Sequence, residues 1–325
     1  MQVDKDGEKR YYNIIMENKE LKTFKITKFR HSTDIKNGSA VAVGGFDGVH
    51  IGHRAMIVSL VNEAKRNSVP AVVFTFDAAD SPKSESRLLA ADEKKNLLLS
   101  SLGVDAVVSV PFSEIRDMRA SDFVKTVFVD LLHAKSIVCG YDFRFGNERE
   151  GDVSLIKALL PEVNVSTPNA VVLDGAPVSS TLIRNLIANG DFLKANALLG
   201  HSFSFRAEVE HGRKLGRTLG FPTINQKYPI YLATPRFGVY AVRCNIDGKI
   251  YEGVANVGVK PTVGGEDLPV CETHIFGYSE DCYGKSVETE FIAFIREEEK
   301  FSSLDALKER VLQDMTVAKN ILEEF

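Results

Sequence analysis

The hydrophobic pattern of the chain changes at Gly200, and this change constrains the fold more than any other feature. Before Gly200, short apolar runs alternate with helical patterns, which predicts crossover units on a parallel sheet with helices on both faces. At 325 residues the chain is long enough for two domains. The expected strands are residues 40–43, 71–76, 106–110, 136–139 and 170–173, and the expected helices are 52–67, 92–102, 121–132, 152–159, 179–189 and 192–199.

After Gly200 the apolar residues alternate with polar ones at a period of two. Ile246-Asp247-Gly248-Lys249 is a strong hairpin signal, and closely spaced strands predict a small antiparallel β-barrel. A C-terminal helix at 303–322 is expected to pack on the barrel. Its apolar stripe would be Leu304, Leu307, Val311, Leu312 and Met315. The barrel strands are expected at residues 202–209, 238–246, 249–257, 272–276 and 287–295.

These patterns predict one domain over residues 21–200 and a second over 201–325. Residues 1–20 are polar and charged, and we expect a loosely held extension or an edge element there.

Composition excludes several classes of partner. The formal net charge is −4, so nothing attracts the chain as a whole to nucleic acid or to acidic membranes. No apolar run approaches the ~20 residues of a membrane span, and the N-terminus has no apolar secretory core. The four cysteines form no CxxC pair. We therefore expect a cytoplasmic protein with no nucleic-acid partner and no membrane partner.

The stretch from Val41 to His53 carries the first chemical signal. It reads Val-Ala-Val-Gly-Gly-Phe-Asp-Gly-Val-His-Ile-Gly-His, which predicts a buried strand, a glycine turn and a helix N-terminus. Free backbone N–H groups and the helix dipole make such a turn a phosphate site. His50 and His53, one helical turn apart, could donate hydrogen bonds to a phosphate. The alternative is a strand–helix corner with two surface histidines.

This stretch resembles the GxFDGxHxGH form of the nucleotidylyltransferase HxGH signature, found in the FAD synthetase half of bacterial bifunctional riboflavin kinase/FAD synthetases. Residues 140–146, Gly-Tyr-Asp-Phe-Arg-Phe-Gly, resemble the family's GxDFxFG segment, and residues 179–184 resemble its SSTxxR segment. The resemblance assigns charge stabilisation to His50, His53 and Arg184. It assigns nucleotide, flavin and phosphate binding to Gly45, Phe46, Asp47, Gly48, Asp142, Phe143, Ser179, Ser180 and Thr181.

The second domain contains a glycine-rich basic loop, residues 212–225. Its end resembles the riboflavin kinase GxPTAN signature, with Ile224 in place of alanine. By that resemblance Thr223 and Asn225 hold the Mg²⁺–nucleotide, and both supply the hard oxygen ligands that magnesium requires. Gly216, Gly220 and Pro222 shape the loop around the nucleotide. The alternative is a basic hairpin loop.

Two later segments extend the resemblance. Residues 253–262 match the family's GxxNxGxxPT segment and supply Asn256, and residues 271–274 match V-E-T-H with Cys271 where valine is common. Glu272 would be the general base that takes the proton of the ribityl 5′-hydroxyl. We expect a structural role for His274, and Arg296 is expected to contact the flavin phosphate.

The resemblance, which covers residues 25–325, implies a Rossmann-like α/β nucleotidylyltransferase domain followed by a riboflavin kinase-like antiparallel barrel with a C-terminal helix. It implies a bifunctional transferase that uses Mg²⁺ and ATP. Riboflavin and ATP would give FMN and ADP, and FMN with a second ATP would give FAD and pyrophosphate.

One departure from the family pattern leaves alternatives open. The family usually has Phe-(Asp/Glu)-Pro-His-Pro after its second strand, whereas this chain has Phe76-Asp77-Ala78-Ala79-Asp80. A riboflavin kinase with a degenerate or regulatory first domain is therefore the alternative hypothesis. A non-enzymatic flavin- or RNA-binding regulator is a third, and the acidic balance argues against RNA.

Overall fold

The structure is a computed structural model that describes residues 21–25, 35, 37–77, 87–173, 175–212, 215–260 and 268–325. The predicted extension at residues 1–20 lies outside this part. The chain packs as two compact units, one of residues up to 86 with 91–179 and one of residues 87–90 with 180–325. Packing thus divides the chain between Ser179 and Ser180, ahead of residue 200. The functional boundary at residue 200 stays a prediction.

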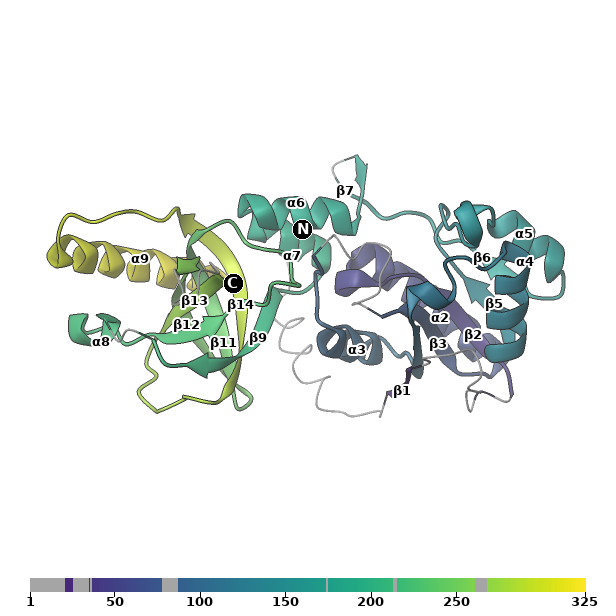
Figure 1. The fold of residues 1–325 in the computed structure, drawn as a ribbon, viewed down its shortest axis with the longest axis horizontal. Coiled ribbons are helices and arrows are strands. Elements are labelled where there is room, and N and C mark those ends of the chain that lie inside the picture. Colours follow the sequence, from purple (N-terminus) through teal and green to yellow (C-terminus); the bar gives the residue numbers. More distant parts are fainter. Residues whose placement is uncertain are drawn as a thin grey trace. The chain divides into compact units, whose positions relative to one another are not determined.

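A six-stranded parallel sheet forms the centre of the first unit (Figure 1). Its strand order is β1-β4-β3-β2-β5-β6, and all neighbouring strands run parallel. The strands are β1 (Lys22–Lys25), β2 (Ser39–Val43), β3 (Ala71–Phe76), β4 (Ala106–Val110), β5 (Ala134–Val138) and β6 (Asn164–Ser166). The parallel sheet and its four central strands are confirmed.

The edges of the sheet differ from the prediction. The strand expected at residues 170–173 is present only as β7 (Val172–Leu173). Its expected place in the parallel sheet is wrong, because β7 pairs with β8 (Ala176–Pro177) in a separate, exposed hairpin. The sheet ends instead at β1 and at β6, a three-residue strand in which only Val165 is buried. Short edge strands lack the apolar run that marks an internal strand, so the sequence pattern missed them.

Helices cover both faces of this sheet. Alternate residues of β2 belong to two different cores: Val41 and Val43 to one, Ala40 and Ala42 to the other. Fully buried strands of this kind are expected in a parallel sheet with helices on both faces. The helices of this unit are α2 (Ile51–Asn67), α3 (Asp92–Ser101), α4 (Ala120–Phe123), which continues as the π-helix η4 (Val124–Leu131), and α5 (Val153–Leu159), with short 3₁₀ turns η1 (Asp47–Val49), η3 (Phe112–Glu114) and η5 (Asn147–Arg149).

The second unit is built on a closed antiparallel barrel, as predicted, with the strand order β10-β13-β12-β11-β14-β9. The predicted hairpin at Asp247-Gly248 is confirmed, and both residues have positive φ angles, 51° and 83°. The strands are β9 (Phe203–Glu210), β10 (Ile224–Lys227), β11 (Gly238–Ile246), β12 (Lys249–Lys260), β13 (Leu268–Ile275) and β14 (Ser286–Arg296). Strand β10 was not predicted.

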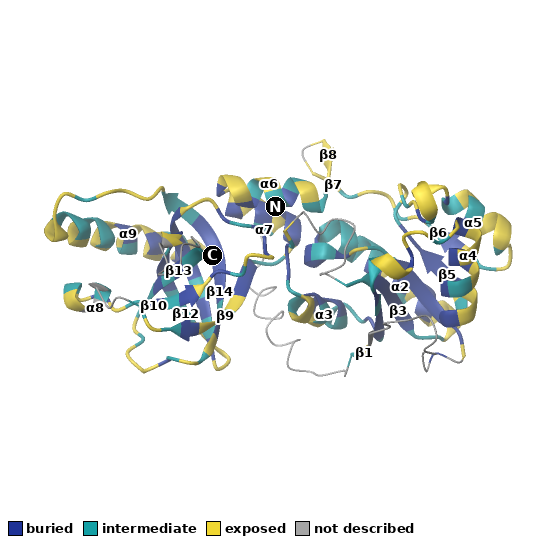
Figure 2. Cartoon of the chain, in the orientation of Figure 1, coloured by how far each residue is buried: buried dark blue, intermediate teal, exposed yellow. Residues whose placement is uncertain are grey.

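Helix α9 (Leu304–Glu324) packs on the outer surface of the barrel (Figure 2). Its predicted apolar stripe is partly wrong, because Leu304 and Leu312 are exposed. The helix buries Asp314, Ala318 and Leu322 instead. The buried face thus contains a carboxylate that a purely apolar stripe could not predict.

Two further helices, α6 (Ser180–Asn189) and α7 (Phe192–Leu199), belong to the second unit. The predicted cap at Asp191 is confirmed, since its carboxylate accepts a hydrogen bond from the Lys194 N–H at 3.2 Å. Phe192 contacts Phe291 of the barrel at a ring distance of 5.2 Å. The remaining helix is the short α8 (Leu215–Leu219), which lies in the predicted glycine-rich loop.

All four cysteines are described, buried and free. Burial raises the pKa of Cys139 to about 11 and the pKa values of Cys244 and Cys271 to about 12. Among the helices of the described residues, none has the length and apolar character needed to cross a membrane.

Candidate active sites

The turn between β2 and α2 has a strained backbone. Phe46, Gly48 and Val49 all have positive φ angles, of 48°, 73° and 42°. This conformation is unfavourable for a β-branched residue such as Val49, and such strain is typical of functional turns. Phe46 and Val49 are fully buried, so core packing holds the turn in place. The hydroxyl of Thr75 in β3 fixes the turn further by donating to the Gly45 carbonyl at 3.2 Å.

The two predicted histidines are brought together at the start of α2. Their rings are stacked, with centroids 3.6 Å apart and planes inclined by 14°. His50 caps the helix, because its Nδ1 accepts the backbone N–H of His53 at 3.3 Å. A neutral His50 ring must therefore carry its proton on Nε2, where it can act as a donor.

Gly52 leaves room for this arrangement. A Cβ at Gly52 would lie 3.2 Å from both Cε1 and Nδ1 of His50, closer than ordinary packing. The glycine between the two histidines thus lets the His50 ring fold back over the helix start. His50 is buried, with 5% of its surface exposed, whereas His53 is half-buried.

The segment at residues 140–146 is held mainly by its aromatic side chains. Phe143 stacks on Phe145 at 5.3 Å, and Phe145 packs in the core against Phe123. Asp142 is exposed. Gly146 has a φ of 77°, and a Cβ there would lie 2.8 Å from Ala120. Part of this motif is therefore explained by packing: Phe145 is buried and Phe143 half-buried, whereas Tyr141, Asp142 and Arg144 are exposed.

The departure from the family pattern begins at Asp77. This residue follows β3 and its carboxylate accepts a hydrogen bond from Ser109. Residues 78–80, which replace the usual Pro-His-Pro, lie outside the described residues.

The SSTxxR segment spans the division between the units. Ser179 ends the first unit, while Ser180, Thr181 and Arg184 belong to α6 of the second. Arg184 Nε donates to the carbonyl of Arg87 at 2.6 Å, which anchors the guanidinium to residues 87–90. The α6 residues of this segment therefore belong to a different unit from His50 and His53.

The predicted kinase residues converge on the outer surface of the barrel. Glu272 on β13 is the register partner of Asn225 on β10 and of Asn256 on β12. Directly opposed residues on neighbouring strands point to the same side of a sheet. The three side chains therefore form one row of a carboxylate between two amides.

A cavity of about 310 Å³ lies between this row and α9. Glu272 and Asn256 line it from the barrel, and Leu307 and Val311 line it from the helix. Of the other predicted residues, Gly216, Thr223 and Arg296 also line it. Apolar walls with a few polar groups are typical of a small-molecule site.

A second cavity has a volume of about 370 Å³. Thr223 is a lining residue of both cavities. Pro222 lines the second cavity together with Tyr278, Asp281 and Tyr283 from the segment after β13. None of these three residues was predicted as a site residue, although Tyr283 with Gly284 belongs to the riboflavin kinase resemblance.

The glycines of the kinase loop have distinct structural reasons. A Cβ at Gly212 would lie 2.5 Å from the Asn225 amide oxygen, and one at Gly216 would lie 2.5 Å from the Phe221 carbonyl. Gly220 has a φ of 92°. The loop contains the short helix α8, and Gly212 and Gly216 approach Asn225 and Phe221 closely; residues 213 and 214 lie outside the described part.

His274 joins the cavity to the Thr223 turn. It lines the first cavity, and its Nδ1 lies 2.8 Å from the Pro222 carbonyl. Because a carbonyl only accepts, Nδ1 carries a proton and donates. The structural role expected for this histidine stays a prediction, and its contact with the turn is in accord with it.

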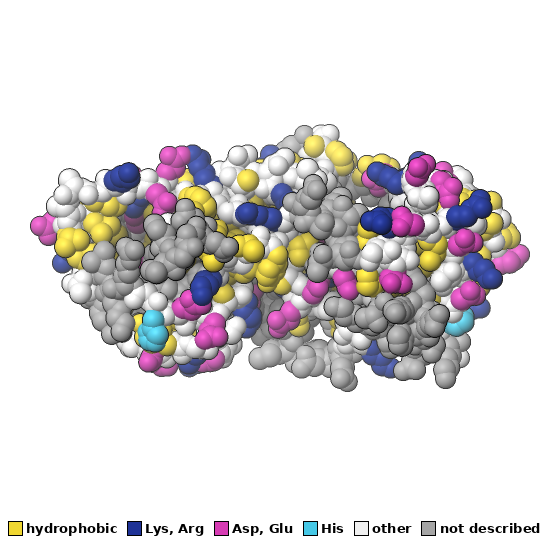
Figure 3. All heavy atoms as spheres, viewed as in Figure 1, with side chains coloured by type: hydrophobic (Ala, Val, Ile, Leu, Met, Phe, Trp, Pro, Cys, Tyr) yellow, Lys and Arg dark blue, Asp and Glu magenta, His cyan; other side chains and the backbone are white. Residues whose placement is uncertain are grey.

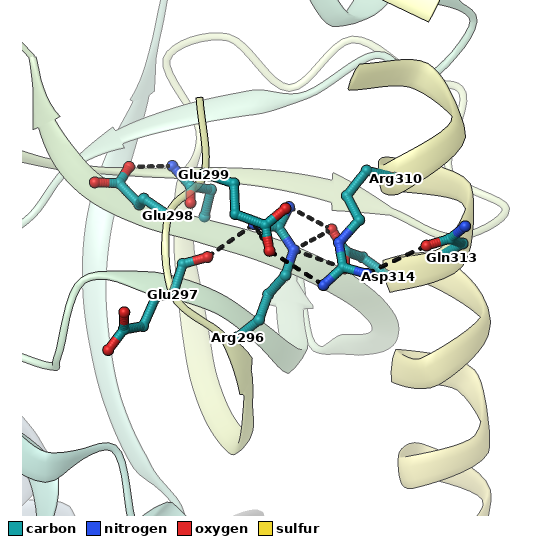
Figure 4. Close-up of polar contacts among 8 residues, drawn as sticks. Arg296, Glu297, Glu298, Glu299, Arg310, Gln313 and Asp314 are labelled. Carbon is teal, nitrogen blue, oxygen red and sulfur yellow. Dashed lines mark hydrogen bonds and ion pairs between the residues drawn. The ribbon is translucent and has the colours of Figure 1, made fainter. Parts of the chain in front are cut away.

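Arg296 lines the cavity but is already engaged (Figure 4). Its Nε and terminal nitrogen donate to both carboxylate oxygens of Asp314, at 2.7–3.1 Å. Sequence analysis missed Asp314. A usable signal existed, since this carboxylate follows Val311 by three positions on the helix face that carries apolar residues.

The visible charges of the described surface are mixed. On the face drawn in Figure 3, Lys and Arg side chains are interspersed with Asp and Glu among the described residues. This distribution agrees with the small formal net charge of −4.

Comparison with known proteins assigns a family to each half of the chain. A FAD synthetase model matches residues 32–182, and a riboflavin kinase model matches residues 199–322. A crystal structure of a protein described as a macrolide-efflux protein from Streptococcus pneumoniae has a TM-score of 0.83 at 29% identity. The match covers 92% of this chain and 99% of that one.

Curated relatives match almost end to end. The bifunctional riboflavin kinase/FMN adenylyltransferase of Haemophilus influenzae is 34% identical over 90% of this chain and 97% of its own length. The protein of the same name from Pseudomonas fluorescens is 36% identical over 87% of this chain and 92% of its own. That from Escherichia coli K12 is 34% identical over 87% and 93%. With both halves matched in order, this chain belongs to the bifunctional riboflavin kinase/FMN adenylyltransferase family.

Proposed function

We propose that this chain makes FAD from riboflavin in two ATP-dependent steps carried out at separate sites. The first step transfers the γ-phosphoryl group of ATP to riboflavin and releases ADP. The second transfers the adenylyl group of another ATP to FMN and releases pyrophosphate. The observation that carries the proposal is the row of Asn225, Glu272 and Asn256 beside the cavity under α9.

The barrel cavity is the proposed riboflavin site. Its apolar walls from Leu307 and Val311 suit the flat isoalloxazine ring, and Glu272, which also lines it, would accept the 5′-hydroxyl proton. As that proton moves to Glu272, the hydroxyl oxygen attacks the γ-phosphorus and the bond to ADP breaks.

The second cavity is the proposed nucleotide site of the kinase. Its shared wall with the first, Thr223, would set the reacting ends of the two substrates against each other. Alignment of this kind is the main contribution of an enzyme to phosphoryl transfer. Gly216, Gly220 and Pro222 would shape the loop around the phosphates.

Thr223 and Asn225 would hold the magnesium that accompanies the nucleotide. Hydroxyl and amide oxygens are hard donors, and this donor set fits Mg²⁺. When bound, the ion would neutralise charge on the phosphates of ATP.

The turn between β2 and α2 is the proposed adenylyl-transfer site. The phosphate of FMN would attack the α-phosphorus of ATP, and His50 and His53 would donate hydrogen bonds to the charge that develops. The backbone from Gly45 to Gly48 would hold the nucleotide.

By the resemblance, further residues would bind the two substrates of adenylyl transfer. Arg184, whose Nε is held by Arg87, would use its terminal nitrogens for the triphosphate beside Ser179, Ser180 and Thr181. Asp142 and Phe143 would line the flavin side.

Product analysis tests both steps. Purified protein is incubated with ATP, Mg²⁺ and either riboflavin or FMN, and the flavins are separated by chromatography. Riboflavin should yield FMN and then FAD, and FMN alone should yield FAD. No FMN from riboflavin would reject the kinase step.

The replacement of Pro-His-Pro by Ala78-Ala79-Asp80 favours one competing hypothesis, a kinase whose first unit only senses nucleotide or flavin. Absence of FAD at high enzyme concentration, with FMN formed normally, would establish that alternative. Free, buried cysteines and the need for ATP support a cytoplasmic location for the proposed reactions.

A further inference from the structure

A buried ion pair joins the end of β14 to the middle of α9 (Figure 4). The side chains of Arg296 and Asp314 are only 11% and 4% exposed. Arg296 reaches both carboxylate oxygens of Asp314, with Nε at 2.9 and 3.1 Å and a terminal nitrogen at 2.7 Å. A forked, two-oxygen contact of this kind fixes both orientation and distance.

The rest of the Arg296 guanidinium is also engaged. Its other terminal nitrogen donates to the Glu297 carbonyl at 2.8 Å, and the guanidinium carbon lies 5.8 Å from the centre of the Phe301 ring. Arg296 is therefore held by the chain around it, which does not favour the predicted role as a phosphate ligand.

A second arginine ties the same carboxylate into a wider cluster. Arg310 lies 3.8 Å from Asp314 and 3.3 Å from Glu299. Its guanidinium therefore forms ion pairs both within α9 and with the segment after β14. The next carboxylate along this segment, Glu298, accepts a hydrogen bond from Asn256 at 3.0 Å. The cluster thus connects α9 to the row that contains Glu272.

The cluster also forms part of the cavity wall. Arg296, Glu298, Glu299 and Asp314 all line the cavity, as do Leu307 and Val311 on the same helix. Moving α9 away from β14 would therefore open the apolar side of the cavity while leaving Glu272 and Thr223 on the barrel in place.

We propose that Asp314 is a positioning residue for riboflavin, because its ion pair with Arg296 holds α9 in place as one wall of the flavin cavity. This inference rests on the proposed kinase function of that cavity. Removing the carboxylate leaves a buried guanidinium without its partner, and the helix relaxes. Riboflavin affinity then falls, while the chemistry at Glu272 and the nucleotide cavity is retained.

The first test is Asp314→Asn, assayed by quenching of riboflavin fluorescence and by steady-state kinetics. We expect the Kd and the KM for riboflavin to rise about tenfold, while kcat and the KM for ATP change less than about twofold. FAD formation from supplied FMN reports that the rest of the chain is folded. An unchanged riboflavin Kd overturns the proposal.

The second test replaces the pair with apolar side chains of similar size, Arg296→Met with Asp314→Leu. Buried pairs are often replaceable in this way without loss of stability. Recovery of the riboflavin Kd to within about threefold of the wild-type value supports a positioning role. A large fall in kcat in this double variant would show that Arg296 acts on the reacting groups, and it would overturn the proposal. If Asp314→Asn does not fold, this variant alone decides.

Asp247→Asn is the matched control. It removes the same charge from an exposed pair with Lys285, at 2.8 Å, and asparagine tolerates the φ of 51° at that position. Riboflavin binding should be unaffected; a rise equal to that of Asp314→Asn overturns the proposal. If the wild-type chain itself neither binds nor phosphorylates riboflavin, the kinase assignment fails rather than the role of Asp314.

Discussion

Glu272 and Asn225 face each other as register partners on β13 and β10, with Asn256 on the far side of Glu272. Substituting Glu272→Gln keeps the size of the side chain and removes its ability to accept a proton. We expect FMN formation to fall about 10³-fold, in the range that positioned general bases supply. The kcat for each reaction is measured with purified protein. FAD formation from FMN should be unchanged, and equal loss of both activities would refute separate sites.

His53→Ala should have the opposite effect. His53 is half-buried and stacks on His50, so its loss removes a donor without opening a core cavity. FAD formation should fall about 100-fold, as for loss of one oxyanion donor. FMN formation from riboflavin is the internal control. Normal FAD synthesis by this variant would remove His53 from the chemistry.

His50 has a second role that substitutions can separate. Because His50 caps α2, His50→Ala should also lower the free energy of unfolding by about 1 kcal/mol. His50→Asn supplies another capping side chain and should recover that stability without recovering FAD formation. Urea unfolding followed by circular dichroism measures the first effect. Equal stability of the two variants would show that the cap contributes little.

Gly52→Ala tests the reason for the glycine between the histidines. The added Cβ would meet the His50 ring at 3.2 Å, so the ring must move. Small displacements of a reacting group can cost about 100-fold in rate. We expect FAD formation to fall substantially, with FMN formation and the melting temperature nearly unchanged. Full activity would mean that the His50 ring shifts freely.

The buried thiols predict a loss of stability in alkali. Burial raises the pKa of Cys271 from 9.0 to about 12, so the folded state keeps the neutral thiol while the unfolded chain ionises. This contribution is complete below pH 9 and is lost progressively as the pH rises towards 12. Between neutral pH and pH 10.5 the free energy of unfolding should fall by about 2 kcal/mol from this thiol alone. Urea unfolding at pH 7.5 and pH 10.5 measures this loss in the wild-type protein and in Cys271→Val. The variant should lose about 2 kcal/mol less than the wild type over this interval. Identical pH dependence of the two proteins would contradict the prediction.

The sequence predicted the parts of the fold that carry a periodic signal. The central strands at 71–76 and 106–110 are mostly apolar runs, each with one small hydroxyl residue, and helix α7 has a clear cap at Asp191. Strand β10 has no such signal, because one of its two buried residues, Gln226, is polar. That amide is satisfied by the Val287 carbonyl and the Thr289 hydroxyl, contacts that only the closed barrel creates.

The candidate sites divide in the same way. The motifs in the sequence pointed to His50 and His53, which lie together at one helix start. They also pointed to Glu272 and Asn256, which line one cavity. The binding of Arg296 by Asp314 was out of reach, because it depends on how α9 rotates against the barrel. Asp314, a carboxylate on an otherwise apolar face of α9, shows how the helix is rotated only once Arg296 is known to be its partner.

The presence of Thr223 in the lining of both cavities has a thermodynamic consequence. If occupation of one cavity shifts this side chain, the surroundings in the other cavity change as well. The two binding equilibria would then be linked, and linkage is reciprocal: whatever factor the nucleotide imposes on flavin affinity, the flavin imposes on nucleotide affinity.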